Sequence, residues 1–331
     1  MKRTEKKPRQ LHRLPPRKIV VVGASAGGIP PICKLLSLLP DDFPYPIFVV
    51  VHIGRLPSLL PQVLNNCGSL QATHPREGEL IRAGRIYVAP PNQHLLVRDG
   101  VIGLSHGPRE NRSRPAVDTL FRSAARAFRE NVIGILFSGE LDDGVAGLFA
   151  IRARGGLTIA QDPAEAVAPS MPRTAVHSGN VDHVLPITKI AALLTNLSQN
   201  NRMKTQNKKG AIRSGRRSSL EPEDVEGNPI PMACPDCNGP LFEVTEGETV
   251  KFHCIVGHSY SPLSLSDAHA DALERAIWVA IRTLKEGLTL HRALSDKHKT
   301  SSEKELVQRL GEDAERIEKD IKLLEEIQKH I

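Results

Sequence analysis

The chain has 331 residues, 40% of them hydrophobic and only 4% aromatic, so two or three structural units with mainly aliphatic cores are expected. No run of about 18 apolar residues occurs, and no apolar signal-peptide core follows the basic N-terminus, so we expect a cytoplasmic protein without a transmembrane segment. The net charge of +7 is concentrated in residues 1–17, predicted to be a disordered tail, and in residues 202–217. Both segments lack aromatic side chains for base stacking, so nucleic acid is not an expected partner.

Residues 18–196 alternate short β-branched runs with helical patterns. The predicted strands cover residues 18–22, 47–51, 85–89, 132–137 and 157–160, with another near Val184; the predicted helices cover 29–39, 57–66, 115–129 and 145–154 and begin again at 188. Asp99-Gly100, between two short apolar runs, predicts a β-hairpin. This alternation predicts an α/β fold with a doubly wound, mostly parallel sheet in three layers, α/β/α. Such sheets carry their chemistry at the carboxyl ends of the strands.

Three further segments follow this predicted domain of residues 18–196. Residues 197–230 are polar, first basic and then acidic, and are predicted to be a linker. Residues 231–262 hold a cysteine cluster. Residues 268–331 carry leucine and isoleucine at steps of three and four, which predicts an α-helical hairpin with a break near Ser301-Ser302.

The first candidate for chemistry is Gly23-Ala24-Ser25-Ala26-Gly27-Gly28, between the first predicted strand and helix. Gly-x-Ser-x-Gly in that place is typical of a nucleophile elbow, where small neighbours allow a sharp turn that exposes the serine hydroxyl. A phosphate-binding glycine loop and a plain tight turn are the alternatives. Neither Gly-x-Gly-x-x-Gly nor Gly-Lys-Ser/Thr is present, which disfavours the phosphate loop.

A serine nucleophile needs a base, and the base needs an orienting carboxylate. His52 follows the second predicted strand, and Asp143 lies just after the apolar run that ends at Phe137, with Asp142 as its rival. Taken alone, each of the three residues has an ordinary structural explanation. Their joint placement at the ends of three strands favours a triad of Ser25, His52 and Asp143. The chain order Ser, His, Asp differs from the Ser, Asp, His order of α/β-hydrolases, so the scaffold is a different one.

The sequence resembles the catalytic domain of the CheB-type protein-glutamate methylesterases. The matching segments are Val-Val-Gly-Ala-Ser-Ala-Gly-Gly around Ser25, Val-Val-His-Ile around His52, Arg114 to Phe121, Ser138-Gly139 through Asp143-Gly144, and Ala160 to Pro163 running on to Met171-Pro172. The resemblance covers roughly residues 18–190. It implies that Ser25 attacks glutamyl methyl esters and releases methanol, with glutamine deamidation by the same route, and that no cofactor is needed for catalysis.

The resemblance also implies further site residues. The amides of Ala26 and Glu140 are the expected oxyanion-hole donors, and Arg112 and Arg114 are candidates for steering an acidic substrate helix. Glu140 stands where the family usually carries methionine, so its carboxylate is expected to tune or restrict activity. Residues 1–17 are expected to be a basic tail in place of the family's N-terminal receiver domain, so control by phosphorylation within the same chain is not expected.

The expected partners are a methylated receptor or another signalling protein, and a separate receiver or methyltransferase protein. Because of the departures around Glu140 and the missing receiver, a second hypothesis stays open. In it the chain is a catalytically weakened esterase fold that serves as a signalling module and binds a partner.

The cysteine cluster predicts a metal site. Cys234 and Cys237 form one pair, and Cys254 and His258 follow after 16 intervening residues. Three thiolates and an imidazole are a tetrahedral ligand set that Zn²⁺ prefers, and four protein ligands leave no open position, so the zinc is expected to be structural within a ribbon-like module. Cys33 and Cys67 are expected to be unreactive, packed thiols.

Overall fold

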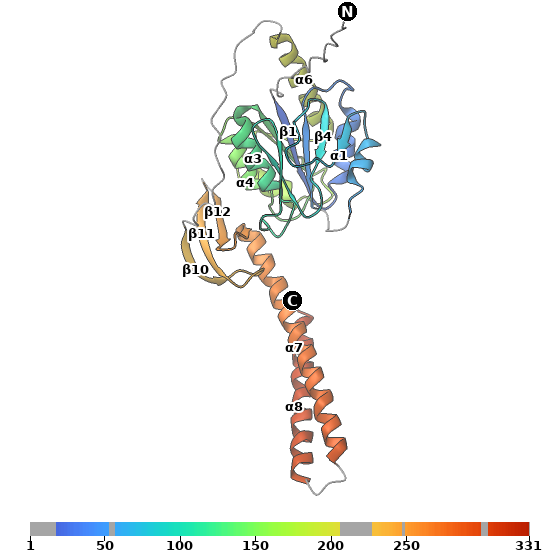
Figure 1. Ribbon diagram of the computed structural model, residues 1–331, viewed down its shortest axis with the longest axis vertical. Coiled ribbons are helices and arrows are strands. Elements are labelled where there is room, and N and C mark those ends of the chain that lie inside the picture. Colours follow the sequence, from blue (N-terminus) through green and yellow to red (C-terminus); the bar gives the residue numbers. More distant parts are fainter. Residues whose placement is uncertain (1–17, 53–56, 206–226, 247–248, 299–303, 331) are drawn as a thin grey trace, which may run out of the picture. The chain divides into compact units, whose positions relative to one another are not determined.

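The computed structural model describes residues 18–52, 57–205, 227–246, 249–298 and 304–330 (Figure 1). They form two compact units, one ending at Ser264 and the other beginning at Leu265. The predicted N-terminal tail lies outside the described residues. Within the described residues, no helix is long and apolar enough to cross a membrane.

A seven-stranded parallel sheet in the order β3-β4-β2-β1-β7-β8-β9 forms the centre of the first unit. Its strands are β1 (Ile19–Ala24), β2 (Ile47–Val51), β3 (Gln71–Thr73), β4 (Arg85–Val88), β7 (Val132–Leu136), β8 (Leu157–Gln161) and β9 (His183–Leu185). Every residue of β1, β2 and β7 is buried, because helices cover both faces of the sheet, and this explains their uninterrupted apolar sequences. The predicted doubly wound fold is confirmed.

Helices pack on both faces of the sheet, and Figure 1 shows α1 on the opposite side from α3 and α4. One layer contains α1 (Ile29–Leu38), α2 (Leu60–Asn65) and α6 (Ile187–Thr205); the other contains α3 (Val117–Phe128), α4 (Val145–Arg152) and α5 (Ser170–His177). A 3-10 turn, η1 (Arg129–Asn131), joins α3 to β7. The predicted hairpin around Asp99-Gly100 is present as antiparallel β5 (His94–Val97) and β6 (Ile102–Ser105). Side chains of β1 alternate between the two cores, with Val20 and Val22 in one and Ile19 and Val21 in the other.

The direction of the chain connections reverses at the centre of the sheet. β1 pairs with both β2 and β7. β1 leads into α1 on one face, whereas β7 leads into α4 on the other. A crevice forms at such a switch point, outside the carboxyl ends of the strands, and it is the usual binding place in doubly wound sheets.

Strands β10 (Asn228–Ala233), β11 (Pro240–Glu246), β12 (Thr249–Cys254) and β13 (Ser259–Tyr260) form a separate antiparallel sheet in the same unit. We call residues 228–260 the ribbon. The linker predicted over 197–230 is shorter than expected, because α6 continues to Thr205 and β10 begins at Asn228. Residues 206–226 of that linker lie outside the described part of the chain.

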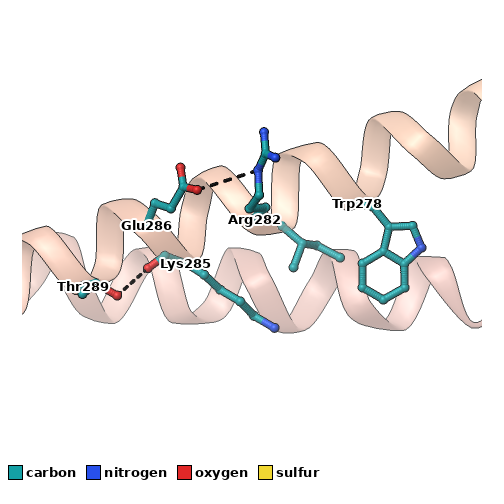
Figure 2. A pocket seen from close by; sticks show the side chains of 6 residues that line it. Trp278, Arg282, Lys285, Glu286 and Thr289 are labelled. Carbon is teal, nitrogen blue, oxygen red and sulfur yellow. Dashed lines mark hydrogen bonds and ion pairs between the residues drawn. The ribbon is translucent and has the colours of Figure 1, made fainter.

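The second unit is formed by α7 (Pro262–His298), from Leu265 onward, and by α8 (Lys304–Gln328). The two helices run side by side (Figure 1). Ion pairs between Lys285 and Glu325 and between Arg292 and Glu318 join the two helices. The predicted break near Ser301-Ser302 falls outside the described residues. A surface groove of about 350 Å³ along α7 is lined by Trp278, Ile281, Arg282, Lys285, Glu286 and Thr289. Figure 2 shows the side chains that line it.

Cys33 and Cys67 are joined by a disulfide, with their Cα atoms 5.0 Å apart. The expectation of two separate, packed thiols was therefore wrong. Sequence periodicity placed each cysteine near a helix but carried no information on the distance between α1 and the end of α2. Packing of these two helices brings the thiols together across 34 positions of sequence.

Candidate active site

Ser25 lies in the tight turn between β1 and α1. Gly27 has a φ of 68°, a left-handed conformation that favours glycine, and a Cβ on Gly28 would lie 2.4 Å from the Cβ of Ala24. The Gly28 amide donates to the Ser25 carbonyl at 3.0 Å, and the Ser25 amide donates to the Ser138 carbonyl at 2.9 Å. The small residues of the motif are thus required by the turn, which fixes Ser25 at the switch point of the sheet.

His52 follows β2 and lies between the serine and a carboxylate. Its Nδ1 is 3.1 Å from Ser25 Oγ, and its Nε2 is 2.7 Å from Asp143 Oδ2. Both contacts are satisfied when Nε2 carries the proton and donates to Asp143, while Nδ1 accepts from the serine hydroxyl. The side chain is 19% exposed, which leaves it accessible from solvent. The arrangement suits removal of the Ser25 proton by His52.

Asp143 is 2% exposed and is held by the N-terminus of α3. The amides of Val117 and Asp118 donate to its two oxygens at 2.7 and 3.0 Å, and the Asn111 side-chain amide donates at 2.9 Å. Burial alone would raise the pKa of Asp143, but the hydrogen bond and charge of His52, together with these amides, outweigh burial and lower it. Asp143 is therefore a carboxylate built to orient an imidazole.

The neighbouring Asp142 contacts a different partner. Its Oδ1 accepts a hydrogen bond from the Ser261 hydroxyl at 2.6 Å. Burial raises its pKa to about 6, and the charges of Asp118 and Asp143 act in the same direction. Of the two rival acids, it is Asp143 that contacts His52.

The expected oxyanion donors lie in the two loops beside Ser25. Ala26 is exposed in the elbow, and its carbonyl accepts from the buried Ser138 hydroxyl at 2.8 Å. Glu140 is exposed in the loop after β7. Between them Gly139 packs closely, since a Cβ at this position would lie 2.9 Å from the Ser25 Cβ. This absence of a side chain allows the β7 loop to approach the serine.

The two predicted arginines lie in the loop before α3. The Arg114 guanidinium donates to Asn92 Oδ1 and to the carbonyls of His106 and Gly107, so it holds neighbouring loops together. The peptide bond between Arg114 and Pro115 is cis. Arg112 is half-buried with a φ of 64°. Their role in substrate binding stays a prediction.

Sequence reasoning did not assign roles to several residues that surround Asp143. They are Asn111, Asp118, Lys251 and Ser261, all buried. Asp118 lies within the Arg114–Phe121 segment that carried the family resemblance, so that motif was a usable signal. Lys251 belongs to the ribbon, and Ser261 directly follows it. No sequence pattern connects either residue to the triad.

Cys234, Cys237, Cys254 and His258 come together in the ribbon, with one ligand atom from each within 4.8 Å of all the others. The Sγ atoms of Cys237 and Cys254 are 3.7 Å apart, and His258 Nδ1 lies 3.7 Å from Cys234 Sγ and 3.4 Å from Cys254 Sγ. A tetrahedron with zinc–sulfur bonds of about 2.3 Å has edges of about 3.8 Å. The four residues fit a zinc ion in both chemistry and spacing.

Comparison with known proteins gives consistent matches to the part of the chain that holds Ser25, His52 and Asp143. The family model described as CheB methylesterase matches residues 20–194. A Leptospira interrogans protein named as a candidate protein-glutamate methylesterase/protein-glutamine glutaminase is 41% identical over 184 residues, which are 55% of this chain and 95% of that protein. Protein-glutamate methylesterase/protein-glutamine glutaminase 2 of Anaeromyxobacter dehalogenans is 40% identical over 55% of this chain and 54% of its own length.

A solved structure is also similar. The Thermotoga maritima CheB methylesterase catalytic domain superposes with a TM-score of 0.52 at 33% identity, covering 54% of this chain and 98% of that domain. These matches cover about half of the chain.

Proposed function

The chain belongs to the CheB methylesterase family, and on that premise we propose that it hydrolyses methyl esters of glutamyl side chains through Ser25, His52 and Asp143. The observation that carries this proposal is the pair of distances at His52, 3.1 Å to Ser25 Oγ and 2.7 Å to Asp143 Oδ2. They match the nucleophile–base and base–carboxylate contacts that acyl transfer requires.

The reaction begins when His52 Nδ1 takes the hydroxyl proton and Ser25 Oγ attacks the ester carbonyl. The imidazolium then donates that proton to the leaving methoxide, and methanol departs. Water then loses a proton to His52 as it attacks the acyl-serine. The bond to Ser25 Oγ breaks, the imidazolium returns the proton to Oγ, and the glutamate leaves and ionises to its carboxylate. Asp143 stabilises the imidazolium in both halves, because it is buried, ionised and hydrogen-bonded to Nε2. A glutamine side chain would react by the same route and release ammonia.

The tetrahedral oxyanion needs amide donors beside Ser25. Prolines at positions 30 and 31 of α1 have no N–H, and the Gly28 amide is already bonded to Ser25 O. These facts favour the Ala26 amide as one donor. The Glu140 amide is proposed as the second, because its loop follows the neighbouring strand β7.

We propose that the substrate is a methylated glutamyl residue on a receptor-like signalling protein. The relatives' names specify glutamate on a protein, and a half-exposed site at the switch point of the sheet is open to a side chain presented by another molecule. When bound by Cys234, Cys237, Cys254 and His258, zinc would have a structural role, since all four positions of a tetrahedral ion are filled by protein.

Methanol release from a receptor helix carrying glutamyl methyl esters tests the proposal. The parent should release methanol, the Ser25→Ala variant should release it only at a small residual rate, and Ser37→Ala, at an exposed serine of α1, should match the parent. If no methanol is released from this helix by the folded parent, the proposed substrate class is wrong.

A further inference from the structure

Three buried aspartates lie together behind the catalytic histidine. Asp118, Asp142 and Asp143 are 1%, 9% and 2% exposed. Carboxylates seldom gather in a protein interior unless cations or hydrogen-bond donors compensate them, because each charge loses its hydration and repels the others. His52 and the α3 amides serve Asp143, and Ser261 serves Asp142. The negative charge of Asp118 needs a different compensating group.

Lys251 of β12 supplies that compensation. Its Nζ lies 2.6 Å from Asp118 Oδ2, and its side chain is 1% exposed. Arg122 is the other cation near this oxygen, at 4.0 Å. A lysine is almost never fully buried unless it is paired, so this contact is a specific one. It joins the ribbon to α3 across 133 positions of sequence.

Asp118 in turn fixes the surroundings of Asp143. Its Oδ1 accepts from the amides of Gly144 at 3.0 Å and Gly147 at 2.7 Å, which hold the start of α4 directly after Asp143. Its Oδ2 accepts from Asn111 Nδ2 at 3.1 Å, and the same amide nitrogen donates to Asp143 Oδ1 at 2.9 Å. A continuous path therefore runs from Lys251 through Asp118 and Asn111 to Asp143.

Asn111 is oriented from its other end by residues that follow the ribbon. Its Oδ1 accepts from the Ser261 amide at 3.1 Å and from the Ser264 hydroxyl at 3.2 Å. With the oxygen so occupied, the Asn111 NH₂ group must face the two aspartates. Lys251 lies three residues before the candidate metal ligand Cys254, and Ser261 lies three residues after His258. A metal bound there would fix both strands from which these contacts extend.

We propose that Lys251 is a positioning residue of the esterase, and that the metal-binding ribbon completes the active site by holding Asp118, Asn111 and hence Asp143 in register with His52. This rests on the proposed function of Ser25, His52 and Asp143. Lys251 does not touch the reacting atoms; it acts through Asp118. The ribbon is thereby part of the catalytic unit.

The first test compares Lys251→Met with the parent. Lys189→Met, the same change at an exposed position of α6, is the matched control. The readouts are the rate at which a fluorophosphonate labels Ser25 and the kcat and KM of methanol release. We expect labelling and kcat to fall by between about tenfold and a hundredfold with little change in KM, as for a displaced catalytic constellation. The control should match the parent. Parental labelling by a folded Lys251→Met protein overturns the proposal.

The double variant Asp118→Asn/Lys251→Met separates positioning from folding. It removes both buried charges, so its thermal stability should recover relative to Lys251→Met. Its labelling rate should stay low, because the asparagine has one acceptor oxygen and cannot receive both the α4 amides and Asn111. Recovery of rate together with stability would show that Lys251 only balances charge, and would overturn the proposal. If Lys251→Met alone does not fold, the labelling rate of the folded double variant is compared with that of the parent instead.

The labelling experiment keeps the two proposals apart. If the parent is labelled at Ser25 but releases no methanol, the proposed substrate fails, while the comparison of labelling rates still tests Lys251. If the parent is not labelled at Ser25, the proposed nucleophile fails and the inference about Lys251 fails with it.

Discussion

Replacing Asp142 with asparagine should stabilise the first unit at neutral pH and do so progressively less at acidic pH. Burial raises the pKa of Asp142 from an ordinary value of 3.8 to about 6. A carboxyl group whose pKa is raised by folding favours the folded state below its unfolded pKa, and this advantage is lost as the pH rises through the folded pKa. Above pH 7 the ionised Asp142 therefore opposes folding.

The magnitude follows from the size of the pKa change. Raising the pKa of Asp142 from 3.8 to about 6 costs about 3 kcal/mol of stability once the carboxyl group is fully ionised. At pH 5, below the folded pKa, only about half of this loss is present, so the advantage of Asp142→Asn should grow by about 1 to 2 kcal/mol between pH 5 and pH 8. The asparagine oxygen can still accept the Ser261 hydroxyl, so little of this difference is lost with the hydrogen bond.

Amide hydrogen exchange of the central strand β1 provides the assay, because its slowest amides report global opening of the first unit. The single tryptophan, Trp278, lies on α7 and reports on the second unit instead. Asp41→Asn, at an exposed position after α1, serves as the matched control. Its effect on the free energy of opening should be the same at both pH values. An advantage of Asp142→Asn that stays constant or shrinks from pH 5 to pH 8 would refute the reasoning.

Three further outcomes are expected. Gly139→Ala should lower methanol release by about tenfold or more, because the new Cβ would lie 2.6 Å from Met171 Cε and 2.9 Å from the Ser25 Cβ; an unchanged rate would mean that the β7 loop moves freely. Glu140→Met should raise kcat/KM by about two- to fivefold at low salt and less at high salt, since an exposed carboxylate acts through screened solvent; a rate unchanged at low salt would end the idea that Glu140 restricts activity. Removal of metal with a strong zinc chelator should release about one zinc per chain and lower the rate of Ser25 labelling, whereas Cys254→Ser should bind no zinc from the start; full labelling after complete zinc loss would contradict the link between ribbon and triad.

The sequence predicted best those features that depend on residues close together in the chain. β1, β2 and β7 were recognisable because strands covered on both faces are apolar throughout. Their carboxyl ends carry Ser25, His52 and the loop of Asp143, so a rule about sheet edges was enough to place the three side chains together.

Elements with weak local patterns were missed. β3 has three residues, too few for a period to show. α5 contains Pro172 and has eight residues, so its apolar positions resemble a loop. Each gains its stability from packing against the sheet rather than from its own sequence.

The sequence did not predict the long-range contacts either. The contacts of Lys251 with Asp118 and of Ser261 with Asn111 span 133 and 150 positions and follow no periodic pattern. The disulfide of Cys33 with Cys67 depends in the same way on how two helices pack. Such contacts depend on how segments far apart in the chain pack together, and no local sequence pattern records that packing.

Methanol release by Ser25→Ala, His52→Ala and the double variant tests most directly whether Ser25 and His52 act as one catalytic unit. Residues that act as a unit lose their contribution together, so the double variant should be no slower than the slower of the two single variants. A double variant slowed by the product of the two single effects, or a His52→Ala protein with the parental rate, would contradict the triad.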